Sequence, residues 1–169
     1  MKKGFTIIEV VAYVAVLGIL GTSFSATLLW SMKTYTKSRV MHQTLWDAQR
    51  AMDTMVQEIR EARRVYIPTT SASQLSLATS KYAPAGHAES FIDFFLCEEK
   101  LCMKKESQDP AAITSDSVRV ASLSFTRVQQ APGAESIRIT LQVGYKNPNG
   151  RPELASSVEL SSAASIRNP

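Results

Sequence analysis

A run of apolar residues at the beginning of the sequence constrains the fold more than any other feature. Residues 5–30 carry a single charge, that of Glu9. An α-helix rises about 1.5 Å per residue, so about twenty apolar residues in a helix span a bilayer core of roughly 30 Å. The sequence therefore predicts that residues 5–30 form a membrane-spanning helix.

Three interpretations of this run differ in how they account for Glu9. A secreted signal peptide would explain the basic residues before the run and the small residues near Ser23 and Ala26. Its apolar core, however, is usually only about 7–15 residues long and uncharged. A plain membrane anchor would avoid Glu9, because a carboxylate at the centre of a spanning helix costs about 2.5–3.5 kcal/mol. The third interpretation provides a positively charged group for Glu9 to neutralise.

That interpretation depends on the residues at the start of the run. Lys2-Lys3-Gly4 stands directly before Phe5-Thr6-Ile7-Ile8-Glu9-Val10. Over residues 2–18 the sequence resembles the class III signal of type IV pilins and type II secretion pseudopilins. In that family a short basic leader ends in Gly and is followed by Phe-Thr-Leu-Ile-Glu and an apolar helix. The resemblance implies that a prepilin peptidase cuts the chain between Gly4 and Phe5 and methylates the new amine of Phe5.

The chemistry of the motif is consistent with this processing. A basic leader stays on the cytoplasmic side of a membrane, and Gly4 has no side chain to keep a protease away from the backbone. Cleavage would create a positive amine at Phe5, and Glu9 lies four residues further on, on the same face of the helix. Glu9 could neutralise the amine of its own chain or, as the resemblance implies, that of an adjacent subunit during assembly. A buried pair of this kind sets register more than it adds stability.

The helical pattern continues beyond the apolar run. Asp47 and Arg50 are expected on a solvated face of this continuation, and no proline occurs before Pro68. The sequence therefore predicts one helix over residues 5–67, whose second half, 31–67, needs a partner to cover its apolar stripe. The stripe consists of apolar residues at steps of three and four: Met41, Leu45, Ala48, Met52, Met55, Val56, Ile59, Ala62 and Tyr66.

Residues 68–169 show a different pattern, with short alternating runs separated by Pro, Gly, Asn and Ser. The pattern predicts strands over 74–78, 91–97, 118–128 with a register break near Ala121, and 137–145. A final weak strand begins at Val158 and fades after Leu160. An antiparallel sheet laid over an amphipathic helix buries the apolar sides of both. We therefore expect an α+β fold in four parts: a cleaved leader 1–4, a membrane-spanning helix 5–30, its amphipathic continuation 31–67, and a β-rich head 68–169.

This arrangement also resembles a pilin head. Residues 91–128 look like the J-type minor pseudopilins, in which a hydrophobic strand turns through a hairpin and meets a later strand rich in Leu and Phe. Residues 157–168 are similar to the closing strand of the family.

The two cysteines are close together in the sequence. The spacing of Cys97 and Cys102 suits the two arms of a tight hairpin. A disulfide between them would stabilise the hairpin by about 2 kcal/mol and would place the head in an oxidising compartment. Half of a zinc ribbon is an alternative, but it needs two more ligands at characteristic spacing, and only His42 and His87 remain. Two free buried thiols are the third possibility.

Charge does not decide the orientation of the predicted membrane helix. Lys33, Lys37 and Arg39 flank its far end as densely as Lys2 and Lys3 flank its near end, so the excess of cations that marks a cytoplasmic side is lacking. The cysteines decide it better, because a disulfide favours a head outside the cytoplasm.

The sequence contains no recognisable catalytic motif. It lacks Gly-x-Ser-x-Gly, His-Glu-x-x-His and a phosphate-binding glycine loop, and we expect Asp93, Glu98, Glu99 and the Lys104-Lys105 pair to be solvated. A net charge of +4 makes no case for nucleic acid, and loss of the leader would lower it further. We therefore expect no enzyme activity, no cofactor, no metal and no small-molecule substrate.

These features together predict a minor pilin or pseudopilin, a structural subunit of a type IV pilus-like or type II secretion filament. The expected partners are other pilin or pseudopilin subunits, the prepilin peptidase and the inner membrane, with the head in the periplasm or another extracytoplasmic space. The alternative is a single-pass, membrane-anchored binding module that does not assemble.

Overall fold

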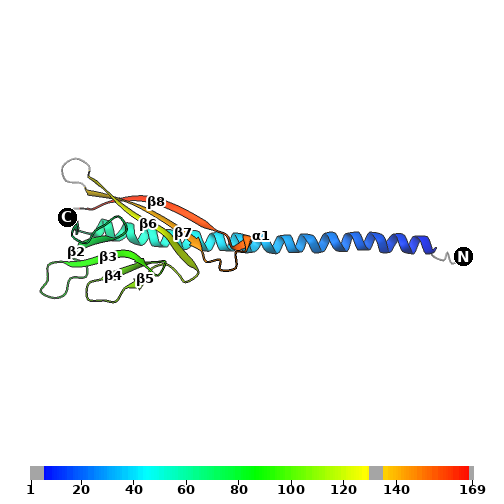
Figure 1. Cartoon of the computed structure of the whole chain (residues 1–169), viewed down its shortest axis with the longest axis horizontal. Coiled ribbons are helices and arrows are strands. Elements are labelled where there is room, and N and C mark those ends of the chain that lie inside the picture. Colours follow the sequence, from blue (N-terminus) through cyan, green and yellow to red (C-terminus); the bar gives the residue numbers. More distant parts are fainter. Residues whose placement is uncertain (1–5, 130–134, 168–169) are drawn as a thin grey trace.

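The computed structural model describes residues 6–129 and 135–167. Its dominant element is a single helix, α1, which spans Ile7–Glu61. Figure 1 shows the N-terminal half of α1 projecting alone from a head in which β-strands lie beside the C-terminal half. The fold is thus α+β, as expected.

Burial along α1 separates its two halves. Val40 is the first buried residue of the helix, and between Ile7 and Arg39 no side chain is buried. From Val40 onward a stripe of buried residues faces the strands: Val40, Thr44, Asp47, Ala48, Ala51, Met52, Met55, Glu58 and Ile59. Packing against the sheets thus covers only the C-terminal part of the helix.

The helix ends at Glu61, so the prediction that it continues to residue 67 was wrong. Ala62 already has an extended backbone, with φ −70° and ψ 151°. The N–H groups of Arg63 and Tyr66 donate hydrogen bonds of 2.8 Å to the carbonyls of Ala78 and Ser76. Strand pairing therefore takes the backbone out of the helix without a proline, because tertiary contacts override a local preference.

The first sheet is antiparallel and has the order β1-β2-β3-β4-β5. Its strands confirm the predictions for 74–78 and 91–97, and β4 is the second arm of the expected hairpin. The bounds are Arg64–Val65 for β1, Leu75–Thr79 for β2, Ser90–Cys97 for β3, Lys100–Lys105 for β4 and Ala111–Ala112 for β5.

The second sheet has the order β6-β7-β8 and is also antiparallel. Strands β6, Val118–Gln129, and β7, Glu135–Tyr145, confirm the two longest predicted strands. The register shift lies between Val120 and Ser122, which confirms the break expected near Ala121. A short 3-10 helix, η1, at Pro152–Leu154 leads into the last strand.

Strand β8 spans Ser157–Ser165, so the prediction that it fades after Leu160 was wrong. Its small Ser and Ala residues have little strand propensity of their own. The whole strand nevertheless pairs with β7, from Ser157 opposite Gly144 to Ser165 opposite Ser136. It also packs against α1, and this non-local support explains why local patterning missed its second half.

One hydrophobic core joins the helix to both sheets. Met55 and Ile59 of α1, Phe94 of β3 and Leu141 of β7 are completely buried within it. α1 packs on β7 and β8, while β3 and β4 approach β6, so the sheets meet at that strand. Figure 1 places the two sheets on either side of the end of α1.

Candidate functional site

The exposed half of α1 is the largest feature of the structure that the head does not cover. Ile7 is 87% exposed and Trp30 is 70% exposed. By length and composition this part of the helix is able to cross a membrane, and none of its apolar window is buried. An apolar surface of this size is unusual on a soluble monomer.

Hydroxyl side chains in this half of α1 satisfy their hydrogen bonds within the helix. Thr22 and Ser23 both donate to the carbonyl of Ile19 at 2.9 Å. Ser25 and Thr27 donate to carbonyls four residues earlier, also at 2.9 Å. Polar groups in a bilayer must be satisfied internally, so these residues are compatible with a membrane span. Glu9 is then the one charged group in it.

Glu9 lies in the first turn of α1 and is only partly exposed. The hydroxyl of Tyr13, one turn further on, donates to its Oε1 at 3.5 Å, a long and weak contact. A carboxylate in the first turn is favoured by the partial positive charge of the helix N-terminus. Gly4 and Phe5, the predicted cleavage site, lie outside the described residues.

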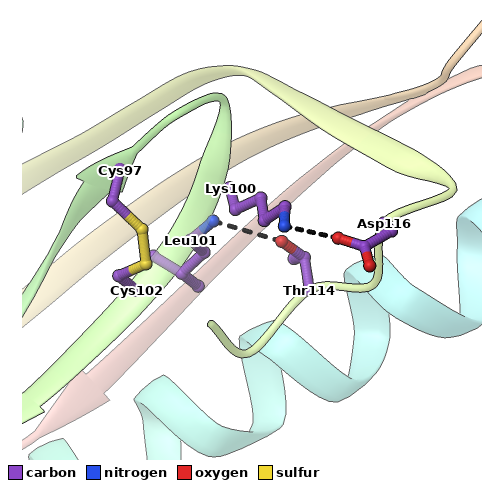
Figure 2. The surroundings of a disulfide bond; sticks show 6 residues. All are labelled: Cys97, Lys100, Leu101, Cys102, Thr114 and Asp116. Atoms are coloured by element: carbon purple, nitrogen blue, oxygen red, sulfur yellow. Dashed lines mark hydrogen bonds and ion pairs between the residues drawn. A yellow bond between two sulfur atoms is a disulfide. The ribbon is translucent and has the colours of Figure 1, made fainter. Parts of the chain in front are cut away.

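Cys97 and Cys102 lie within disulfide distance of each other, with their Cα atoms 5.9 Å apart. Cys97 ends β3 and Cys102 lies in β4, so the pair closes the predicted hairpin, and Figure 2 shows the bond. Among residues 6–129 and 135–167, no group of three His, Cys, Asp or Glu could hold a metal ion. The position of the cysteines across the hairpin and their Cα separation are consistent with a disulfide.

The turn of this hairpin is backbone-strained. Glu98 and Glu99 have φ values of 48° and 62°, a left-handed conformation that costs a residue with a Cβ roughly 1–2 kcal/mol. Asn and Gly are the usual residues at the centre of such a two-residue turn. Both glutamate side chains are exposed, as expected.

Contacts to the start of β6 and to the segment before it hold the strained turn in place. The N–H of Val120 donates to the carbonyl of Glu99 at 2.7 Å. The N–H of Leu101 donates to Oγ1 of Thr114 at 3.2 Å. An ion pair joins Lys100 to Asp116, and Figure 2 shows it beside the Leu101–Thr114 contact. The Lys100 ammonium lowers the pKa of the Asp116 carboxyl. The hairpin is thus tied to the start of the second sheet.

Asp93 differs from its neighbours Glu98 and Glu99. It lies within β3, is partly buried and accepts a hydrogen bond from the hydroxyl of Ser76. The prediction that it belongs to a solvated loop was wrong. The partner is on β2, a pairing that the spacing of Asp93 along its own strand does not reveal.

Asp47 also differs from the prediction that it lies on a solvated face of the helix. It is 6% exposed, and the hydroxyl of Ser115 donates to its Oδ2 at 2.6 Å. Ser115 and Ser117 share a further hydrogen bond of 2.7 Å. Gln43 donates to Ser117 at 2.9 Å. Together these contacts tie α1 to the segment between β5 and β6, so Asp47 is a structural rather than a solvated carboxylate.

A second carboxylate of α1, Glu58, is buried near the end of the helix. Its Oε1 accepts a hydrogen bond of 3.1 Å from the hydroxyl of Tyr82 and lies 3.5 Å from Nζ of Lys81. Lys81 also contacts Glu61 at 2.6 Å and lowers the pKa of the Glu61 carboxyl. No spacing in the sequence links Tyr82 or Lys81 to the helix, so their contacts with Glu58 are visible only in the structure.

No protein-family model matches the chain, and comparison with curated proteins and with solved structures gave no significant match. Its function must therefore be argued from its own residues. The features that bear on it most are the bare half of α1, the lone Glu9 and the disulfide-bonded head.

Proposed function

We propose that this chain is a minor pilin or pseudopilin, a structural subunit of a type IV pilus-like or type II secretion filament. The observation that carries the proposal is that Glu9 is the one charged residue of the apolar stretch 7–30 of α1, which the head leaves bare. In this proposal, prepilin peptidase cuts between Gly4 and Phe5, and the bare half-helix holds the subunit in the inner membrane until assembly.

The bare half-helix supports a subunit that moves from lipid into a bundle of like helices. Before assembly, lipid covers its apolar surface; after assembly, the same half-helices of neighbouring subunits do. Lipid tails are as apolar as these side chains, so packing and polar contacts, rather than the hydrophobic effect, favour the bundle. Moving the half-helix from lipid into the bundle, or back, therefore changes the free energy little. This is what a filament that takes its subunits from a membrane requires.

Glu9 supplies the polar contact that such a bundle needs. An amine at Phe5 would lie at the positive end of the α1 dipole, so an unpaired amine there would be costly once lipid headgroups are left behind. A Glu9 carboxylate of the adjacent subunit would neutralise it. Because both groups would be buried between the packed helices of a filament, a wrong axial offset would leave two unpaired charges, and the pair would thereby fix the register between subunits.

The cysteine pair supports a head outside the cytoplasm. Disulfides persist in the periplasm and in other oxidising compartments and are rare in the cytosol. With the head outside, the basic leader that precedes Gly4 lies on the cytoplasmic side, and Lys33, Lys37 and Arg39 lie on the side of the head. The partners in this proposal are other pilin or pseudopilin subunits, the peptidase and the inner membrane.

The alternative is a membrane-anchored binding module that does not assemble. The bare half-helix would serve equally well as its anchor. That function gives Glu9 nothing to neutralise, and it requires no new amine at Phe5. The two proposals therefore differ in the consequence of removing the carboxylate.

A Glu9→Val variant tests this difference. It should insert in the membrane at least as well as the parent chain, because the helix becomes more apolar, and its leader should still be removed. Its recovery in the sheared filament fraction should fall at least about tenfold, since the amine of a neighbouring subunit is left unpaired. Tyr13→Phe, which removes the hydroxyl that donates to Glu9 and keeps the carboxylate, is the matched control and should assemble. Normal incorporation of Glu9→Val would contradict the register function.

A further inference from the structure

Two lysines lie on the helix face that the head covers, but nearer the N-terminus of α1, where the head no longer covers it. Lys33, Lys37, Val40 and Thr44 follow one another at steps of four, three and four, which places them on one face of α1. Val40 and Thr44 are buried against the head, whereas both lysines are exposed. The face of α1 that carries the head thus begins, on the side of the bare half-helix, with two cations.

Within the part of the chain that the structure describes, these cations have no acidic partner. Between Glu9 and Asp47 the sequence contains no Asp or Glu, but it contains Lys33, Lys37 and Arg39. None of these three basic residues takes part in an ion pair with any residue within 6–129 or 135–167. The segment that connects the bare half-helix to the head is therefore uniformly positive.

The position of this segment matches the headgroup layer of a bilayer. At 1.5 Å per residue, Lys33 lies about 4.5 Å and Lys37 about 10 Å beyond Trp30 along the axis. Headgroups add roughly 5–7 Å to each side of the apolar core, and a lysine side chain can bend toward them from slightly beyond. Trp30 and Tyr35 are 70% and 71% exposed, and such aromatic residues are enriched at membrane interfaces.

We propose that Lys33, Lys37 and Arg39 form a docking surface for anionic lipid headgroups in the leaflet on the side of the head. Lys33 and Lys37 hold a lipid phosphate on their shared face of α1, and Arg39 binds lipid on the other side of the helix. The proposal rests on the membrane anchorage proposed above, but not on cleavage or assembly. It implies that the subunit carries a shell of anionic lipid that it must leave when it enters a filament.

Lipid selectivity around Trp30 tests the proposal directly. The chain has 2 tryptophans, so a Trp46→Phe background leaves Trp30, one turn before Lys33, as the sole tryptophan, which is excited selectively at about 295 nm. The full chain is reconstituted in phosphatidylcholine vesicles, and quenching is measured with brominated phosphatidylglycerol or brominated phosphatidylcholine. Phosphatidylglycerol should bind near Trp30 at least about fivefold more strongly than phosphatidylcholine, as expected for one cation at an anionic surface.

Two double variants test whether Lys33 and Lys37 cause this lipid preference. In the double variant Lys33→Gln/Lys37→Gln, the ratio of phosphatidylglycerol binding to phosphatidylcholine binding near Trp30 should fall toward one. In Arg50→Gln/Arg60→Gln, which removes the same charge from exposed positions within the head region of α1, it should be unchanged. High salt should weaken the preference of the parent chain, because screening shortens the reach of the cations.

Three results would overturn the proposal, and they are distinguishable. Equal quenching by both lipids in the parent chain would exclude the lipid site but leave the membrane anchor intact. Selectivity that disappears when the protein is diluted in the bilayer would assign the basic face to a second copy of the chain. No quenching by either brominated lipid would contradict the membrane anchorage itself, and with it both proposals.

Discussion

The hydroxyl of Ser115 donates a 2.6 Å hydrogen bond to the buried carboxylate of Asp47, a residue 68 positions earlier in the chain. This contact fixes the segment that precedes β6 against α1, close to the place where the helix leaves the head. It connects the two functional parts of the molecule, because the bare half-helix can orient the head only if α1 is firmly attached to it.

Replacing Asp47 with Ala should therefore weaken the head. The hydroxyl of Ser115 would lose its acceptor on α1, and a lost buried hydrogen bond to a charged group costs about 1–3 kcal/mol. Urea unfolding of the full chain in detergent micelles, followed by near-ultraviolet circular dichroism, measures the change. Asp53→Ala removes an exposed carboxylate of the same helix and should change stability by less than about 0.5 kcal/mol. Equal effects of the two variants would contradict the structural function of Asp47.

A substitution in the strained hairpin turn should increase the stability of the head rather than decrease it. Glu99→Gly should stabilise the head by about 1 kcal/mol, because glycine adopts the φ of 62° found at this position without a steric cost. Glu159→Gly is the matched control. It places the same substitution on the exposed side of β8, where glycine costs about 0.5–1 kcal/mol. Destabilisation by Glu99→Gly would show that the glutamate side chain, rather than its backbone, matters at the turn.

Acid should weaken the head through its paired carboxylates. The Lys81 ammonium lowers the pKa of Glu61, and the Lys100 ammonium lowers that of Asp116. Both carboxylates therefore bind protons more readily in the unfolded chain, so their contribution is complete at neutral pH and is lost as the pH falls below about 4.5. Because the groups are exposed, the effect should be small and should shrink in salt.

Urea midpoints at pH 7 and pH 3 measure this loss. The difference between them should be smaller for Lys81→Gln than for the parent chain, because the carboxyl of Glu61 then has a more ordinary pKa. Lys104→Gln, which removes an exposed lysine of the same head, should leave the difference unchanged. A pH dependence that is identical in all three chains would exclude this ion pair as a source of acid sensitivity.

The parts of the fold that could be predicted are those specified by local pattern. Steps of three and four identified the helix, and alternation identified β3 and β7; even the irregularity near Ala121 is visible in the sequence of β6. These signals are strong because each depends on one face of one element being buried. The cysteine spacing similarly predicts a hairpin without any knowledge of the rest of the head.

The parts that could not be predicted depend on contacts between distant segments. The helix ends early because residues 63–66 pair with β2, and β8 is long because β7 pairs with all of it. Asp47 and Glu58 are charged residues at helix positions that a pattern assigns to solvent. Each is buried because a hydroxyl far along the chain, that of Ser115 or Tyr82, reaches it.

The most direct test of the proposed function is the mass of the N-terminal peptide of the chain recovered from membranes, with and without a co-expressed prepilin peptidase. With the peptidase, the chain should begin at an N-methylated Phe5 and lack residues 1–4; without it, the leader should remain. A chain that keeps Met1 in the presence of the peptidase, or one that is cut near Ala26, would contradict a filament subunit. Glu9 would then have no new amine to neutralise.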